Sequence, residues 1–515
     1  MLRSNSNFCG WLILASAAVG LSTAIVNGAE PASATKVSFH KQIKPLFQAH
    51  CQGCHQPAKQ GGGYEMTSFS RLLKGGESGS AAVVAGKPAA SYLLELVTPD
   101  KSGRAEMPKG KDPLSATDLE LVRRWIAEGA ADDSPASTAA VVDAAHPPVY
   151  SRAPVVPSLD FSPDGKLLAV AGFHEVLLHE RVGDDWTKAP RPAGRLVGLS
   201  ERVEAVKFSP DGKRLAVAAG LPARLGEVQI WDVAAMKLQL SLPVGYDTVY
   251  GVAWSPDAKS VAVGCGDNSV RAFDVATGAQ TLFMGGHNDW ALDTVYSVDG
   301  SHLISVSRDR SAKLTEVETQ RFIDNITSIT PGALKGGLQS VARHPARDEI
   351  VFGGADGIPK IYRVHRITKR VIGDDANLIA VLPGLKGRVF AVDVSNDGKL
   401  IAAASSSDGA GEVGIYSYST DTALPKEIQA VVEKRVMDRT EAESKLLDEH
   451  TKKGVKQLAK TEVPDSGLFA AAFTPDAKQL AVAGADGTVR LLSSADGKIV
   501  ASFVPVPLQK SQSAA

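Results

Sequence analysis

The sequence predicts a multidomain protein, with a small all-α domain followed by a large all-β domain built from repeats. Three observations support this prediction. A Cys-x-x-Cys-His motif at residues 51–55 lies in a segment whose apolar residues recur at helical spacing. A turn sequence close to Ser-Pro-Asp-Gly recurs along the second part of the chain. A segment rich in Ala, Ser, Asp and Pro, residues 134–148, separates the two parts as a linker.

The motif Cys51-Gln52-Gly53-Cys54-His55 is the pattern that attaches a c-type haem. Each thiol can add to one vinyl group of the porphyrin, and the histidine behind them can bind the iron. A structural zinc site usually needs four Cys or His ligands, and the chain has only Cys9 and Cys265 besides these two cysteines. A thioredoxin-like dithiol expects a βαβ context, which is missing here. The motif therefore predicts one covalently attached haem c.

Iron in an electron-transfer cytochrome usually takes a methionine sulfur as its sixth ligand. Only Met66 and Met107 lie in the predicted haem domain, residues 37–133. Met107 lies in a loop before the last predicted helix, from which it can reach the haem face opposite His55, whereas the turn before Met66 is expected to leave it packing at the edge. We therefore expect Met107 as the ligand. The alternatives are Met66, or two core methionines with an open or histidine-ligated iron.

Two helices are expected to bracket the haem-binding motif. The first covers 39–47, where Phe39, Ile43, Leu46 and Phe47 form one apolar face. The second begins at the capping residue Ser115 and ends near glycine 129. This is the layout of a small class I cytochrome c domain.

The first residues predict export. A basic start, an apolar run over 11–26 and small residues behind it form a secretory signal peptide, residues 1–29. Haem attachment outside the cytoplasmic membrane agrees with a location in the periplasm or cell envelope. Membrane association is expected only if the signal remains uncleaved. Once the signal peptide is removed and the haem takes Cys51 and Cys54, Cys265 has no disulfide partner, and its apolar neighbours predict a buried core position.

The segment 37–130 resembles the planctomycete-type cytochrome c domain. The resemblance implies that Met107 occupies the axial-ligand position. It also implies that Trp125 packs the last helix onto the haem or the first helix. Lys109 departs from the second proline that the family commonly has after Met-Pro. The resemblance rests on Phe39, Cys51 to His55, Gly62-Gly63, Lys74-Gly75-Gly76, Val84 to Pro88, Ser91 to Leu94, Met107-Pro108 and Trp125 to Ala130.

Seven repeat units are expected over residues 149–507. The serines of the first turns are 47, 46 and 42 residues apart, which is the length of a four-stranded propeller blade. A closed ring of such blades leaves no apolar face exposed, so we expect a seven-bladed β-propeller, followed by a disordered tail at 508–515. The turns begin at Ser162, Ser209, Ser255, Ser297, His344, Ser395 and Thr474.

The repeats resemble WD40 repeats. Trp231-Asp232 matches the dipeptide that names them, and Gly286-His287 matches their other marker, but most units lack these residues. Between the sixth and seventh turns the chain has a charged helical insert at about 421–453. The insert is either a solvated excursion or a docking element for a partner.

These features favour an exported electron-transfer cytochrome whose propeller docks a redox partner or another envelope protein. One alternative is a redox enzyme with a second cofactor or substrate in the propeller, as in cytochrome cd1, although the chain has only one Cys-x-x-Cys-His motif. Another is a haem-sensing interaction scaffold. No catalytic residue pattern is apparent, and a formal net charge of −1 gives no reason to expect nucleic acid as a partner.

Overall fold

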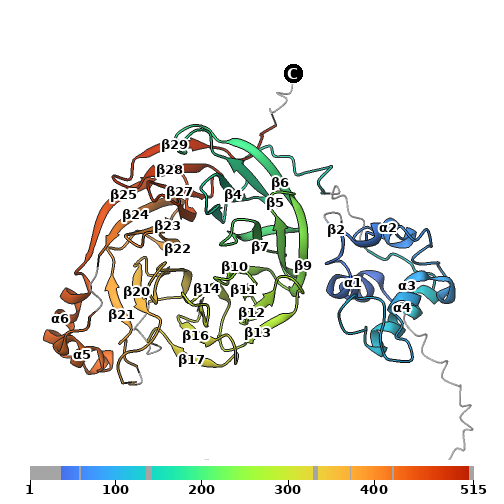
Figure 1. Ribbon diagram of the computed structural model, residues 1–515, viewed down its shortest axis with the longest axis horizontal. Helices are drawn as coiled ribbons and strands as arrows, with labels where there is room; N and C mark the ends of the chain where they lie inside the picture. The colour runs from blue at the N-terminus through green and yellow to red at the C-terminus, as the bar shows by residue number, and fades with distance from the viewer. Residues whose placement is uncertain are drawn as a thin grey trace, which may run out of the picture.

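The computed structural model describes residues 36–56, 59–134, 142–328, 335–369, 371, 373–419 and 423–509. It has a small helical domain and a large ring of β-sheets, which lie side by side (Figure 1). The predicted signal peptide and residues 135–141 of the predicted linker lie outside these residues.

The helical domain is built from short helices around one core. The predicted first helix is present as two consecutive segments, η1 and α1, and its four apolar residues are all buried. Pro45 lies in the first turn of α1, where a missing N–H costs no hydrogen bond. The elements are η1 (Phe39–Ile43), α1 (Lys44–His50), β1 (His55–Gln56), β2 (Lys59–Gln60), η2 (Gly61–Gly63), α2 (Phe69–Lys74), η3 (Pro88–Ala90), α3 (Tyr92–Val97) and α4 (Ala116–Ala127).

The last helix packs on the first. The ring of Trp125 stacks on Phe39 at a centroid distance of 5.4 Å and meets Phe47 edge-on at 6.2 Å. As the sequence predicted, Ser115 caps α4, because its hydroxyl accepts a hydrogen bond from the backbone N–H of Asp118. The core that supports the Cys51–His55 turn is therefore formed by the two ends of the domain together.

The β-rich region consists of antiparallel sheets arranged in a ring, consistent with a WD40-type β-propeller (Figure 1). Five sheets have four strands each, in sequential order. Their strands are β10 (Val249–Trp254), β11 (Ser260–Cys265), β12 (Val270–Asp274) and β13 (Gln280–Met284); β14 (Ala291–Tyr296), β15 (His302–Ser307), β16 (Ala312–Glu316) and β17 (Phe322–Asn325); β18 (Leu338–Arg343), β19 (Glu349–Gly354), β20 (Lys360–Arg363) and β21 (Leu378–Val381); β22 (Arg388–Val394), β23 (Leu400–Ser407), β24 (Ala410–Tyr418) and β25 (Val455–Val463); β26 (Leu468–Phe473), β27 (Gln479–Gly484), β28 (Val489–Ser493) and β29 (Ile499–Phe503).

The remaining sheet has seven strands because one long strand serves two neighbouring groups. The first part of β6 pairs with β5, and its last part, from Arg202 onward, pairs with β7. The strands of this sheet are β3 (Leu159–Phe161), β4 (Leu167–Ala171), β5 (Phe173–Glu180), β6 (Arg191–Phe208), β7 (Arg214–Leu221), β8 (Leu225–Asp232) and β9 (Lys237–Gly245).

The ring closes between the last and the first sheet. Strand β26 contacts β3, just as the first strands of the other sheets contact one another in order. The N–H of Val156 donates to the carbonyl of Gly484, and the N–H of Trp186 donates to Gln479 Oε1. Leu508 forms a parallel bridge with Tyr150, and Gln509 also bonds to Tyr150. The expectation that the disordered tail begins at 508 is therefore wrong for these two residues, because backbone pairing holds them on the ring.

The recurring turns have the hydrogen bonds that their sequence implies. In the first turn, Ser162 Oγ donates to Asp164 Oδ1 at 2.7 Å and accepts from the N–H of Leu167 at 2.9 Å. The turn at His344 lacks this serine and aspartate. There, the imidazole Nδ1 accepts from the N–H groups of Ala346 and Arg347. A histidine thus replaces both side chains in the fifth turn.

One sheet contains a buried hydrogen-bond network centred on His287. His287 Nδ1 lies 3.0 Å from Asp309 Oδ2, and its Nε2 lies 2.8 Å from Ser305 Oγ. Thr315 stands where Trp231 stands in the second repeat, so the network lacks its tryptophan. Elsewhere, Cys265 is buried, as the sequence predicted, and burial raises its thiol pKa to about 12.

Two helices lie between β24 and β25, within the range of the predicted insert. They are α5 (Lys426–Val432) and α6 (Glu441–Thr451), with η4 (Val436–Asp438) between them. They share a small apolar cluster of their own, which includes Ile428 and Leu447. Figure 1 shows them outside the ring, on the side away from the helical domain.

Candidate haem-binding turn and its contact with the ring

The Cys51–His55 turn begins at the end of α1. The N–H groups of Cys54 and His55 both donate to the carbonyl of Cys51, at 3.1 Å each. This tight turn brings the two thiols close together. Cys51 is half-buried and packs against the helical core, whereas Cys54 is exposed.

The thiol of Cys51 is not activated. Burial, with a smaller contribution from nearby Cys54, raises its pKa to about 12. Redox-active Cys-x-x-Cys dithiols have a lowered pKa, because the thiolate is the reactive species. The electrostatics of this turn therefore disfavour a thioredoxin-like role.

His55 is oriented as metal-binding histidines are. Its Nδ1 lies 3.2 Å from the carbonyl oxygen of Tyr64, and the two rings are 5.2 Å apart. A carbonyl oxygen can only accept a hydrogen bond, so this contact places the proton on Nδ1 and leaves Nε2 as the unprotonated ring nitrogen. Fixing one ring nitrogen by a backbone carbonyl is the usual support of a metal-ligating histidine. The residues of this turn thus fit a haem iron.

The two methionines occupy different positions in the helical domain. Met107 is half-buried and packs against the same core as Cys51, and its N–H donates to the carbonyl of Leu96. Met66 is only 3 % exposed. The backbone N–H of Met66 donates to the carbonyl of His55, and its side chain lies in the helical core.

The turn rests against strand β9 of the ring. A Cβ atom added at Gly53 would lie 2.6 Å from the carbonyl oxygen of Ser241, closer than real side chains approach. Only glycine allows this contact. The helical domain accordingly lies beside β9 in Figure 1.

Gln56, the residue after His55, joins a buried polar network in the ring. Its side chain is 0 % exposed, and its Nε2 donates to Ser241 Oγ at 3.0 Å and reaches Glu227 Oε1 at 3.5 Å. Sequence reasoning missed Gly53, Gln56, Ser241 and Glu227. The one sequence signal for this network was Glu227, an acidic residue inside the otherwise mostly apolar strand β8.

A cleft of about 770 Å³ lies next to this contact, between the polar face of α1 and the ring. Its size is that of a small-molecule site. The two domains thus contact each other at Gly53 and Gln56 and are separated by the cleft next to this contact. The side chains along the cleft include Lys41, Lys44 and Gln52 from the helical domain and His174, Arg224 and Tyr246 from the ring.

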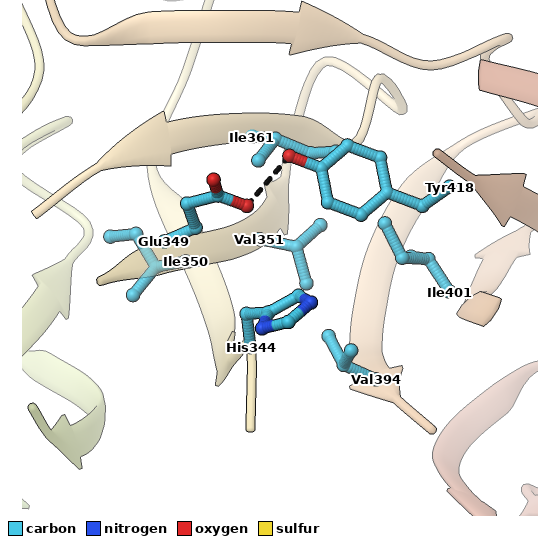
Figure 2. A pocket seen from close by; sticks show the side chains of 8 residues that line it. All are labelled: His344, Glu349, Ile350, Val351, Ile361, Val394, Ile401 and Tyr418. Atoms are coloured by element: carbon cyan, nitrogen blue, oxygen red, sulfur yellow. Dashed lines mark hydrogen bonds between the residues drawn. The ribbon is translucent and has the colours of Figure 1, made fainter. Parts of the chain in front are cut away.

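A second cavity lies between two sheets of the ring and is too small for a substrate. It measures about 10 Å³, which leaves space for one water molecule at most. Figure 2 shows its mostly aliphatic walls and the hydrogen bond from the Tyr418 hydroxyl to Glu349. This cavity is a packing gap at the unusual fifth turn.

Within the described residues, no group of three or more His, Cys, Asp or Glu side chains is placed to hold a metal ion. No helix in the same part of the chain is long and apolar enough to cross a membrane.

Comparison with known proteins identifies both parts of the chain. Residues 51–110 match the family described as planctomycete cytochrome C. Residues 237–274 and 447–500 match the family described as WD domain, G-beta repeat.

Curated relatives resemble only segments of the chain. Periodic tryptophan protein 2 of Arabidopsis thaliana is 25 % identical over 134 residues, which cover 26 % of this chain and 14 % of that protein. WD repeat and SOCS box-containing protein 1 of Danio rerio is 31 % identical over 100 residues, 19 % of this chain and 24 % of that protein. WD repeat-containing protein 90 of Homo sapiens is 31 % identical over 90 residues, 16 % of this chain and 5 % of that protein. The chain thus spans a quarter or less of these relatives. It combines a planctomycete cytochrome C domain with WD40 repeats.

Proposed function

We propose that this protein is an exported c-type cytochrome that binds one haem c and transfers electrons. Cys51 and Cys54 would form the thioether links, and His55 and Met107 would be the protein ligands of the iron. The observation that carries the proposal is the His55 imidazole, fixed through Nδ1 by the Tyr64 carbonyl in the same turn that presents two cysteines. The match to planctomycete cytochrome C supports it.

The haem, when bound, supplies a one-electron iron couple. The chain's residues set its surroundings. Tyr64 orients His55, and a thioether sulfur from Met107 favours the reduced iron and raises the potential. Cys51 and Met107 both pack against the apolar core that contains Trp125 and Phe47. Two protein ligands would leave no open position for a substrate, which would suit electron transfer.

We further propose that the ring is a seven-bladed propeller that docks a protein partner. Dividing the seven-stranded sheet within β6 gives two groups of four strands, which together with the five four-stranded sheets make seven. WD40 repeats commonly mediate protein contacts, which supports this role. Export to the periplasm is proposed from the apolar run at 11–26.

The test is the mass and the pyridine-haem spectrum of the protein expressed with a c-type maturation system and purified from the periplasm. We expect one haem per chain that survives acid–acetone extraction. The double variant Cys51→Ala/Cys54→Ala should lose it. Cys265→Ala is the matched control, because that thiol is buried in the ring and should leave the haem unchanged. An apoprotein mass for the wild type would overturn the haem assignment.

A further inference from the structure

Glu227 is an unusual residue of the ring. It lies on β8, is only 1 % exposed, and accepts hydrogen bonds from four donors. Four acceptor positions are what an ionised carboxylate offers. Among the described residues, no lysine, arginine or histidine forms an ion pair with it. The donors are Gln56 Nε2, Ser241 Oγ, Ser200 Oγ and Gln229 Nε2, the last two at 2.5 and 2.8 Å.

One of these donors comes from the other domain. Gln56 directly follows His55, and its backbone is part of the short strand β1 that leaves the Cys51–His55 turn. Its amide bridges Ser241 and Glu227, so the polar network inside the ring continues into the haem-binding turn. Because Gln56 is fully buried, water does not compete for these bonds.

We propose that Glu227 is a positioning residue for the haem. Through Gln56 and Ser241 it holds the haem-binding turn against β9, and it places a negative charge behind that turn. This inference rests on the proposed function, since it concerns the same haem.

The charge has a defined effect on the iron. Oxidation adds one positive charge to the haem, and a buried carboxylate nearby stabilises the oxidised state. The attraction is stronger inside the protein than in water, because the surroundings are less polarisable. Glu227 therefore lowers the reduction potential of the haem. A residue of the ring thus affects the potential of a cofactor that is attached to the helical domain.

The experiment compares the haem-loaded, full-length variants Glu227→Gln and Asp309→Asn with the wild type. Glu227→Gln keeps the shape of the side chain and one acceptor oxygen, but it removes the charge and replaces the other oxygen with an NH2 donor. Asp309→Asn is the matched control, because it neutralises a buried carboxylate in the His287 network, beyond the end of β15 on another sheet of the ring. Spectroelectrochemical titration should show a positive shift of the potential for Glu227→Gln and none for Asp309→Asn.

A second variant tests the mechanical part of the inference without altering the ring. Gln56→Met keeps the size of the side chain but removes the amide that reaches Ser241 and Glu227. We expect a larger radius of gyration by small-angle X-ray scattering and a positive shift of the potential, because the turn moves away from the charge. If Glu227→Gln fails to fold, the radius of gyration and the reduction potential of Gln56→Met test the inference without it.

An unchanged potential in folded Glu227→Gln, or an equal shift in Asp309→Asn, would overturn the inference. So would a Gln56→Met protein as compact as the wild type and with the same potential. Failure of the proposed function is recognised separately, because the pyridine-haem spectrum of the wild type would then lack a haem c band.

Discussion

At the scale of single residues, the two methionines of the helical domain have different environments and should respond differently to substitution. Met107→Ala should abolish the sulfur-to-iron charge-transfer band of the oxidised protein and let the reduced iron bind carbon monoxide. Met66→Ala should keep the band and lose about 2–5 kcal/mol of stability, since it leaves a cavity in the core. Optical spectra and urea unfolding of both variants check this. A band that survives in Met107→Ala would move the ligand to another residue.

His179 predicts a pH dependence. It is buried beside Phe503, and burial lowers its pKa from 6.5 to about 4. Between these values the unfolded chain binds more protons, so the stabilisation present above pH 6.5 is lost as the pH falls toward 4. The difference is on the order of 3 kcal/mol. In His179→Leu this loss should be absent, so urea unfolding at pH 7.5 and 4.5 should show a smaller acid effect than in the wild type. Equal acid effects in the two proteins would contradict the assignment.

At the scale of elements, the recurring turn depends on its first side chain. Ser209 is fully buried; its hydroxyl donates to Asp211 at 2.6 Å and accepts from the N–H of Arg214 at 2.9 Å. Ser209→Ala leaves that N–H without its partner and should cost about 1–3 kcal/mol in thermal unfolding. Ser209→Thr should restore most of the loss, because Thr474 makes the same bonds in the last turn. Equal stability of the alanine variant would show that the turn holds without the hydroxyl.

The same elements show what a sequence can predict. Local patterns were sufficient for the capped helix at Ser115, for the repeat turns and for buried Cys265, because each depends on neighbours in the chain or on an apolar segment. The contact between Gln56 and Glu227 could not be predicted, because the two residues are 171 positions apart in sequence. It has no local signature, since the residue that follows a Cys-x-x-Cys-His motif has no fixed partner.

At the scale of the whole molecule, charges from several sheets gather around Lys207 on β6. Its ammonium lies 2.9 Å from Asp160 Oδ1, and it interacts with Asp293 and Asp393. Burial raises the pKa of each of these two carboxyls to about 6. The ring thus brings one cation and three carboxyls together from segments far apart in sequence.

Lys207→Met should destabilise the protein in a pH-dependent manner. The cost should be smaller at pH 5, where Asp293 and Asp393 are largely protonated and the loss of the Asp160 pair remains, and should grow as the pH rises through 6 and the two carboxyls ionise. At pH 8 we expect roughly 2 kcal/mol, less than for a fully buried pair, because the Lys207 side chain is 44 % exposed. Urea unfolding at pH 5 and 8 measures this, with the exposed turn residue Lys213→Met as the control. A loss that is equal at both pH values would contradict the charge cluster.

Strand β6 has a mechanical consequence for the whole chain. Its backbone runs without a break through two groups of strands, so the chain itself joins these groups, whereas β26 and β3 belong to separate sheets that contact each other where the ring closes. The Cys51–His55 turn contacts β9 of the same seven-stranded sheet. We therefore expect a partner bound on the opposite side of the ring to leave the contact between this turn and β9 unchanged.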